Sequence, residues 1–276
     1  MLKRYRTATE GSAPGLYVVK PMIEACTFPL LFAPGEGWEY GVGIDWANWA
    51  VERVTGLSVE QYMEKNIWAP LDIKSMTFHP KTKPACMEKL TDMSARSGGK
   101  HAILAFPADP EGKVEYIDNG IWNLDSPGIS AGVGCYGSIV EYQRILQSIC
   151  ANDEKLLARA TVEEMFRPQL SEASRKAWMA RIAIPAIRQA FGGLPESDKG
   201  DWGLGGCLIM EDVPGTMTKG TMVWGGYPNL QWFCDRSAGM SGIFGSQIFL
   251  PGDLKEIALY KEWQKELYEK TGKDIL

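Results

Sequence analysis

The sequence is poor in the residues that build most metal sites and disulfide frameworks. It has two histidines, His79 and His101, and six cysteines with no Cys-x-x-Cys pair. A histidine-rich metal site is therefore implausible, and scattered cysteines fit neither a zinc site nor a disulfide framework. We expect free thiols, no metal or other cofactor, and a reducing compartment, the cytoplasm.

Long apolar runs are absent as well. No stretch approaches the roughly 18 apolar residues of a membrane-spanning helix, and no apolar segment of a secretory signal follows the basic N-terminus. The net charge of −5 argues against nucleic acid or an anionic membrane surface as a partner. With 45% hydrophobic and 23% charged residues, the chain has the composition of an ordinary soluble globular protein.

Apolar residues at helical spacing predict helices over residues 44–54, 139–149 and 161–166. Gly56 stands where a C-terminal glycine is expected, and Ser58 with Gln61 predicts a capping box at the start of another helix that Pro70 ends. Residues 81–127 show little periodicity. Such a long irregular segment is typical of a lid or binding insertion.

After Trp202, short apolar and aromatic runs separated by turns predict an antiparallel meander over 204–210, 221–224, 230–234 and 240–249. Asp253 and Glu256 then predict a capping box at the start of a closing helix. Helices followed by strands indicate an α+β fold. We expect one domain over 1–276, with a helical lobe and lid loop to about residue 200 and sheet strands plus the closing helix in about 201–276.

Two ordered motifs carry a family resemblance. Residues 34–46 read Pro-Gly-Glu-Gly-Trp-Glu-Tyr-Gly-Val-Gly-Ile-Asp-Trp and are followed by Val-Thr-Gly at 54–56; residues 219–229 read Lys-Gly-Thr-Met-Val-Trp-Gly-Gly-Tyr-Pro-Asn. The chain resembles the serine β-lactamase/penicillin-binding-protein-like superfamily over roughly 34–251. Within it, the chain is most similar to fungal polyketide transesterases of the lovastatin side-chain acyltransferase type.

The resemblance implies a β-lactamase/transpeptidase-like fold, an antiparallel sheet flanked by helices with a helical lobe, and roles for several residues. Tyr40 would relay the proton to and from the acyl acceptor, and the strand at Trp224, Gly225 and Gly226 would give a backbone N–H to the oxyanion hole. Without the motif, a tyrosine before a helix is more often a packing aromatic, and a Gly-Gly pair is usually a bulge or turn. Further candidates for the acyl-acceptor pocket are Phe106, Tyr116, Trp122 and Tyr227.

The family's nucleophile motif, Ser-x-x-Lys, is the main departure. The resemblance places it well before the tyrosine motif, so we expect an N-terminally incomplete fold that lacks it. The one match, Ser97-Gly98-Gly99-Lys100, follows Tyr40, and its two glycines disfavour the helix that would put both side chains on one face. We therefore expect this chain to be inactive by itself.

The resemblance implies an acyltransferase of secondary metabolism that works through an acyl-serine intermediate. Its partners would be a small-molecule acyl acceptor and a thioester donor, free or bound to a carrier protein. Two alternatives stay open: an esterase or β-lactamase-type hydrolase with the same groups, and a non-catalytic pseudoenzyme that keeps a binding cleft.

Overall fold

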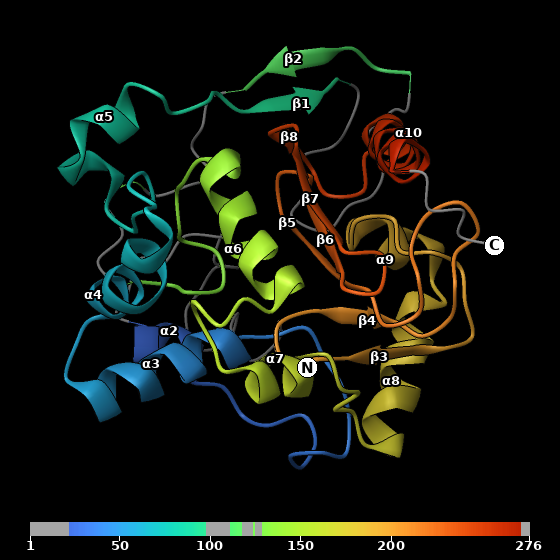
Figure 1. Ribbon diagram of the computed structural model, residues 1–276, viewed down its shortest axis with the longest axis horizontal. Helices are drawn as coiled ribbons and strands as arrows, with labels where there is room; N and C mark the ends of the chain where they lie inside the picture. The colour runs from blue at the N-terminus through green and yellow to red at the C-terminus, as the bar shows by residue number, and fades with distance from the viewer. Residues whose placement is uncertain (1–21, 98–110, 118–123, 125–128, 272–276) are drawn as a thin grey trace.

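The computed structural model describes residues 22–97, 111–117, 124 and 129–271. It contains a five-stranded antiparallel sheet in the order β3-β4-β5-β6-β7 and a small sheet in the order β2-β1-β8 (Figure 1). The strands are β1 (Ser94–Arg96), β2 (Val114–Tyr116), β3 (Gly200–Trp202), β4 (Cys207–Ile209), β5 (Met222–Gly226), β6 (Leu230–Asp235), β7 (Met240–Gly245) and β8 (Ile248–Phe249). The α-helices are α2 (Met22–Cys26), α3 (Gly43–Thr55), α4 (Val59–Met63), α5 (Pro84–Met87), α6 (Ile139–Ala151), α7 (Arg159–Met165), α8 (Glu172–Ile182), α9 (Pro185–Ala190) and α10 (Leu254–Lys270).

The helices of the first half begin and end where local signals place them. Gly56 ends α3 in the left-handed conformation, with φ of 71°. The Ser58 hydroxyl and the Gln61 side chain form the predicted capping box of α4. The chain then continues through a π-turn and a 3-10 turn to Leu71. These signals are read correctly from sequence because each involves residues within one helical turn.

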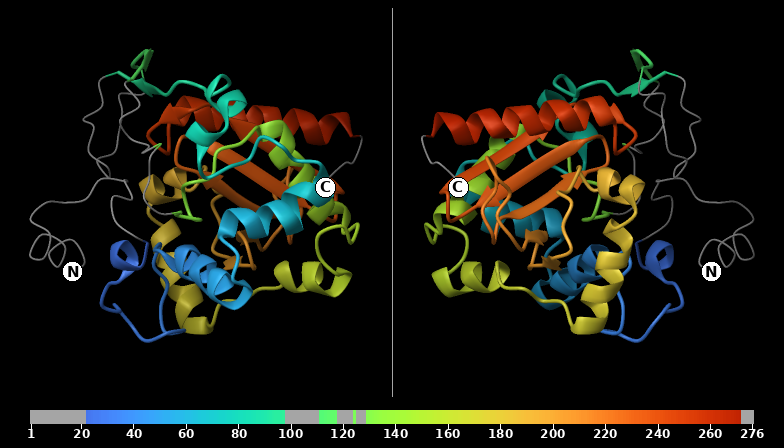
Figure 2. Two further views of the ribbon diagram at one scale, coloured as in Figure 1. Left: turned by 90° about the vertical axis from the view of Figure 1, so that its left-hand side faces the viewer. Right: turned by 90° about the vertical axis from the view of Figure 1, so that its right-hand side faces the viewer.

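The main sheet lies between α10 and α6, one on each face (Figure 2). Successive residues of β6 point to opposite faces. Phe233 packs on Trp263 and Tyr268 of α10, with ring centroids 6.2 and 5.7 Å apart. The next residue, Cys234, points its thiol at the Leu146 carbonyl of α6, 3.9 Å away. Both faces of the sheet are thereby buried.

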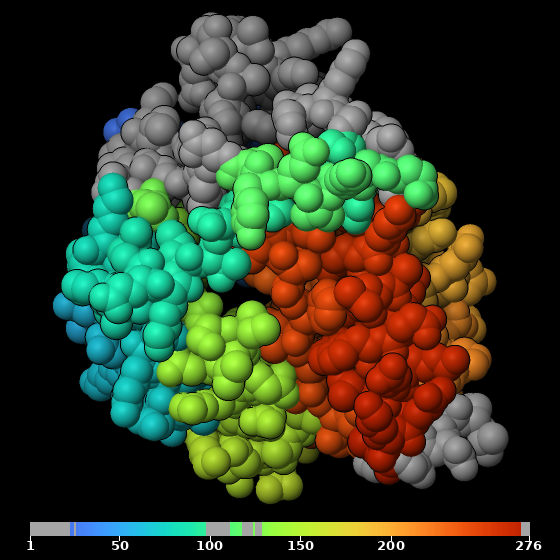
Figure 3. All heavy atoms as spheres, turned by 90° about the horizontal axis from the view of Figure 1, so that it is seen from above, coloured from blue at the N-terminus to red at the C-terminus, as the bar shows by residue number. Residues whose placement is uncertain are grey.

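The prediction of an irregular segment over 81–127 is wrong in part. Strands β1 and β2 form an antiparallel pair, and β1 also pairs in parallel with β8. Residues 240–249 therefore divide between two sheets and do not form one strand. In Figure 3 the segment 111–117 lies against the C-terminal part of the chain, where Glu111 forms an ion pair with Lys255 at 3.0 Å.

Two further differences concern helices. Sequence patterns did not predict α8 and α9, which lie between α7 and the first strand of the main sheet. At the start of α10, the Asp253 carboxylate accepts the Glu256 N–H as predicted, but the Glu256 side chain turns inward to Gln231. Only half of that capping box is formed.

All six cysteines are free thiols, as the sequence predicts. Within the parts of the chain that the structure describes, no helix is long and apolar enough to cross a membrane.

Candidate active site

Tyr40 lies where the loop before α3 meets the end of strand β5. Its ring stacks on Trp224, with centroids 5.9 Å apart and planes inclined by 26°, and lies 5.7 Å from Phe191. The other side of the ring is open, since 57% of the residue is exposed. The structure thus brings together Tyr40 and Trp224, two of the predicted site residues, from positions 184 residues apart.

The backbone of β5 is open at this point. Strand β4 pairs with β5 only through Met222 and Val223, so the stretch Trp224–Gly226 has no partner from β4 along that edge. Gly226 is exposed to solvent. An open strand edge presents backbone N–H groups that a ligand oxygen can use.

Gly225 is required by the sheet itself. A Cβ at this position would lie 2.5 Å from the Leu230 carbonyl oxygen on the neighbouring strand β6. A side chain would therefore push β5 and β6 apart, whether or not a ligand lies on the strand. Gly225 is therefore needed for the packing of β5 on β6, in addition to the role in the oxyanion hole that the resemblance implies.

Helix α8 supports the Tyr40 loop from behind through hydroxyl groups. Ser171, the N-cap of α8, donates to the Gly35 carbonyl at 2.6 Å, and Ser174 donates to the Gly35 and Gly37 carbonyls at 3.1 and 2.9 Å. A loop just before Tyr40 is thus fixed by two side chains one helical turn apart. Ser171 followed by an acidic residue is an N-cap signal in the sequence that would have located this helix.

The same face of α8 holds the loop through two further contacts. Trp178 is fully buried and packs on Trp38, with ring centroids 4.6 Å apart. Arg181 forms an ion pair with Glu39, the residue next to Tyr40. Positions 171, 174, 178 and 181 lie on one helix face, and each contacts the segment 35–39.

An aromatic cluster joins these pieces beneath Tyr40. Trp202 of β3 lies 4.7 Å from Trp224 and 5.4 Å from Trp178, and Phe191 lies 5.0 Å from Trp224. Each aromatic pair of this kind contributes roughly 0.5–1.5 kcal/mol beyond the area it buries. Neither Phe191 nor Trp202 was predicted as part of the site, because only the fold brings Phe191 to Tyr40 and Trp202 to Trp224.

The electrostatic surroundings keep Tyr40 in its neutral form. Although one side of the ring is open, partial desolvation by neighbouring protein atoms and the negative charge of Asp45 both raise the pKa of the Tyr40 hydroxyl above its ordinary value of 10. Tyr40 is therefore a phenol at neutral pH and can donate a hydrogen bond. It becomes a base only when a cation such as a lysine ammonium stands beside it.

The other predicted pocket residues are less closely placed. Tyr227 follows β5, is half-buried against Phe249 at 5.3 Å, and has its pKa raised by burial. Tyr116 is 82% exposed on β2, the outer strand of the small sheet. Phe106 and Trp122 lie outside the described residues. The acceptor pocket remains a prediction.

Ser97 belongs to a hairpin. It follows β1, its hydroxyl accepts the Lys113 N–H at 3.0 Å, and its own N–H donates to the Lys113 carbonyl at 2.8 Å. Lys100 lies outside the described residues. The hydroxyl therefore has a structural role in joining β1 to β2.

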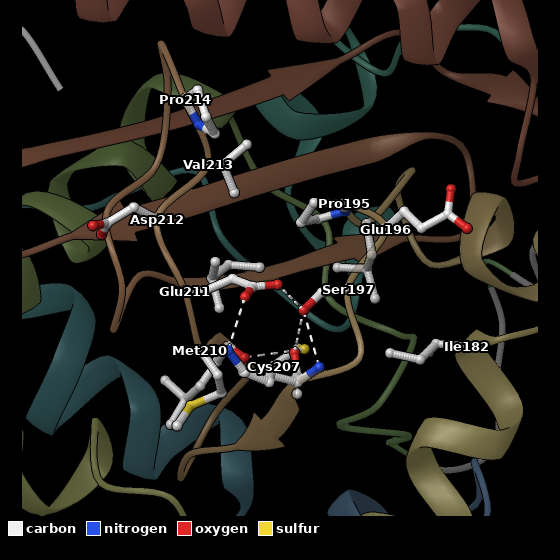
Figure 4. A pocket seen from close by; sticks show the side chains of 15 residues that line it. Ile182, Pro195, Glu196, Ser197, Cys207, Met210, Glu211, Asp212, Val213 and Pro214 are labelled. Carbon is white, nitrogen blue, oxygen red and sulfur yellow. Dashed lines mark hydrogen bonds and ion pairs between the residues drawn. The ribbon is translucent and has the colours of Figure 1, made fainter. Parts of the chain in front are cut away.

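A separate pocket beside β3 and β4 also contains a serine (Figure 4). Ser197 donates to the Glu211 carboxylate, and the Lys199 ammonium pairs with the same carboxylate at 3.3 Å. The lysine charge is thus directed to Glu211. Neither Tyr40 nor Trp224 lines this pocket.

The fold defines a class of protein. An antiparallel sheet with a C-terminal helix on one face and a helical lobe on the other is the β-lactamase/transpeptidase-like architecture. The Beta-lactamase family matches residues 14–259. The chain belongs to this family.

Several similar proteins come from fungi. Lovastatin esterase of Penicillium rubens is 36% identical over 253 residues, which are 90% of this chain and 60% of that protein. Monacolin J acid methylbutanoyltransferase of Aspergillus terreus is 33% identical over 77% of this chain and 49% of its own length. A variant of simvastatin synthase (LovD) from Aspergillus terreus has a TM-score of 0.79 at 33% identity, covering 88% of this chain and 57% of that one. The chain thus spans about half to three-fifths of the length of these relatives.

Proposed function

We propose that this chain carries the proton-relay and oxyanion-binding side of a serine acyl-transfer site. The observation that supports it best is the contact between Tyr40 and Trp224 at an open edge of β5. A proton-relay hydroxyl and a backbone N–H donor must both reach one reacting carbonyl, and the contact of the Tyr40 ring with a residue of β5 supports this assignment. The neutral state of Tyr40 suits a group that gives a proton to the leaving sulfur of a thioester donor; the phenolate left behind can then take the proton of the entering hydroxyl.

The proposed reaction transfers an acyl group from a thioester donor, free or held by a carrier protein, to a hydroxyl of a small secondary metabolite. The relatives named as a methylbutanoyltransferase and an acyltransferase support acyl transfer, and the thioester donor is part of the proposal. Hydrolysis of an ester by the same groups is the second candidate, and the lovastatin esterase relative favours it. Water and an alcohol are interchangeable acceptors for an acyl-serine, so the two activities differ only in what reaches the acyl group.

The nucleophile, in this proposal, belongs to a Ser-x-x-Lys segment other than residues 97–100. Ser97 is used in a hairpin, and the Lys199 ammonium beside Ser197 is paired with a carboxylate. A serine without a basic partner is a weak nucleophile.

We expect no covalent adduct when the 276-residue chain is incubated with a fluorophosphonate and its intact mass is measured. A form extended by upstream coding sequence that contains a Ser-x-x-Lys segment should be labelled stoichiometrically, because serine and base are then present together. With a thioester donor and an alcohol, this form should yield the transferred ester, whereas a hydrolase would yield the free acid.

An adduct on Ser97 or any other serine of the 276-residue chain would contradict the placement of the nucleophile. A lack of labelling in every form would favour the non-catalytic alternative.

A further inference from the structure

Asp45 is a buried carboxylate in the first turn of α3, five residues after Tyr40. Only 6% of the residue is exposed. Its Oδ1 accepts the Ser130 hydroxyl at 2.7 Å and the Gly132 N–H at 3.4 Å. A charge buried to this degree is strongly destabilising unless it is hydrogen-bonded, so these two partners fix the carboxylate in place.

The carboxylate joins two segments that are far apart in sequence. Ser130 stands in a tight turn, where its carbonyl accepts the Gly134 N–H at 2.8 Å. This turn leads to Ser138, the N-cap of α6. Helix α6 in turn donates from Gln143 to the Ser241 carbonyl of β7 at 3.0 Å. A continuous path of contacts thus runs from the start of α3 to the main sheet.

The N-cap position of α3 has no capping side chain. Val42 occupies the N-cap position and makes no side-chain hydrogen bond. The Tyr40 loop enters the helix at this point, with α8 behind it. The tie from Asp45 to Ser130 therefore fixes the first turn of α3, the helix that the Tyr40 loop enters.

We propose that Asp45 is a positioning residue that holds Tyr40 against Trp224 by tying α3 to the segment 129–134. This role rests on the proposed acyl-transfer function of Tyr40. An uncharged Asn could accept the same hydrogen bonds. The negative charge has a second effect, because it favours the protonated phenol over a phenolate five residues away.

The test uses the 276-residue chain with 13C-labelled tyrosine and tryptophan, and Tyr40→Phe to assign the Tyr40 signals. Asp45→Ala should remove the NOE cross-peaks between the Tyr40 and Trp224 rings. Those between Phe233 and Tyr268, whose centroids lie 5.7 Å apart in the core, should remain. Asp45→Asn should keep the ring cross-peaks and lower the pH at which the Tyr40 Cζ signal titrates.

Ser130→Ala is the second variant. It removes the hydroxyl that donates to Asp45, while the Gly132 N–H still donates to the buried carboxylate. It should weaken the Tyr40–Trp224 cross-peaks even where Asp45→Ala unfolds the chain and loses the core signals. Unchanged cross-peaks in Ser130→Ala and an unchanged titration in Asp45→Asn would overturn the proposal.

Acyl transfer by the extended form separates this proposal from the one on which it rests. Loss of the ring contact in Asp45→Ala, with transfer unaffected by Tyr40→Phe, would leave Asp45 as a positioning residue and remove Tyr40 from the chemistry. Loss of transfer in Tyr40→Phe, with normal contacts, titration and rate in all Asp45 variants, would keep the function and remove Asp45.

Discussion

Tyr40→Phe should lower the rate of acyl transfer by about 10²–10⁴-fold in a form of the protein that carries the nucleophile, which is the usual contribution of a positioned proton-transfer group. The substitution removes only the hydroxyl. The ring would still stack on Trp224 and contact Phe191, so the loop should keep its place. We expect the loss in kcat, with KM changed little, because the proton moves only in the transition state.

Tyr62→Phe is the matched control, since Tyr62 lies on α4 and belongs to neither the Tyr40 loop nor β5. Its rate should equal that of the wild type. A Tyr40→Phe protein that transfers acyl groups at the wild-type rate would show that Tyr40 is only a packing aromatic, which is the reading that the sequence alone leaves open.

The unfolding free energy of the chain should fall as the pH rises from about 5 to 8, and Glu256 should be a main cause. Glu256 is 3% exposed, and its carboxylate accepts Gln231 Nε2–H at 2.9 Å. Burial raises its pKa to about 7; hydrogen bonds from Gln231 and Ser246 oppose this shift, and the charge of Asp253 adds to it. Gln231 pairs with Gly225 across the two strands, so this carboxyl lies next to the site strand.

The direction of this pH dependence follows from the pKa of Glu256 in the folded and in the unfolded chain. The pKa is about 7 in the folded chain and near 4.5 when unfolded, so the folded chain binds the proton more tightly. The protonated Glu256 stabilises the folded chain fully below about pH 4.5, and this stabilisation is lost as the pH rises through 7. At about 1.4 kcal/mol per pKa unit, the loss between pH 5 and pH 8 is roughly 2–3 kcal/mol.

Urea unfolding at several pH values checks this in the wild type and in Glu256→Gln. The variant cannot ionise at this position, so its stability should gain roughly 2–3 kcal/mol relative to the wild type over the same interval. Glu262→Gln, an exposed glutamate on the same helix, should follow the wild type. Parallel curves for wild type and Glu256→Gln would show that Glu256 is already ionised in the folded chain at pH 5.

Local signals account for the part of the fold that could be predicted. The glycine that ends α3 and the capping box of α4 act within single turns, and both were identified from the residues involved. Helix α8 was missed because its buried face consists of Ser174, Trp178 and Ile182. A serine that bonds to loop carbonyls does not register as apolar, so the helix shows little hydrophobic periodicity.

The small sheet could not be predicted for a different reason. Strand β1 pairs with β2 and with β8, which are three and two residues long, and β8 lies some 150 residues further along the chain. Strands this short have no alternating pattern to detect, and a parallel pairing over such a separation depends on the whole fold.

Residues of the candidate active site were predicted only where they lie in a family motif. Tyr40 and Trp224 were identified from two ordered motifs, and the structure brings their rings together. Asp45 lies inside the first motif, but its role depends on the distant Ser130 turn. Phe191 carries no motif at all. Contacts of this kind arise from tertiary packing, which a single sequence does not display.

The most direct test of the proposed site is a crystal structure of the extended, phosphonate-labelled protein. We expect a phosphoryl oxygen about 3 Å from a backbone N–H in the stretch Trp224–Gly226, with the Tyr40 hydroxyl within hydrogen-bond reach of another phosphonate oxygen. These are the positions that an oxyanion and a leaving or entering group occupy in acyl transfer. A phosphonate that contacts neither the β5 edge nor Tyr40 would contradict the proposal that they form one active site.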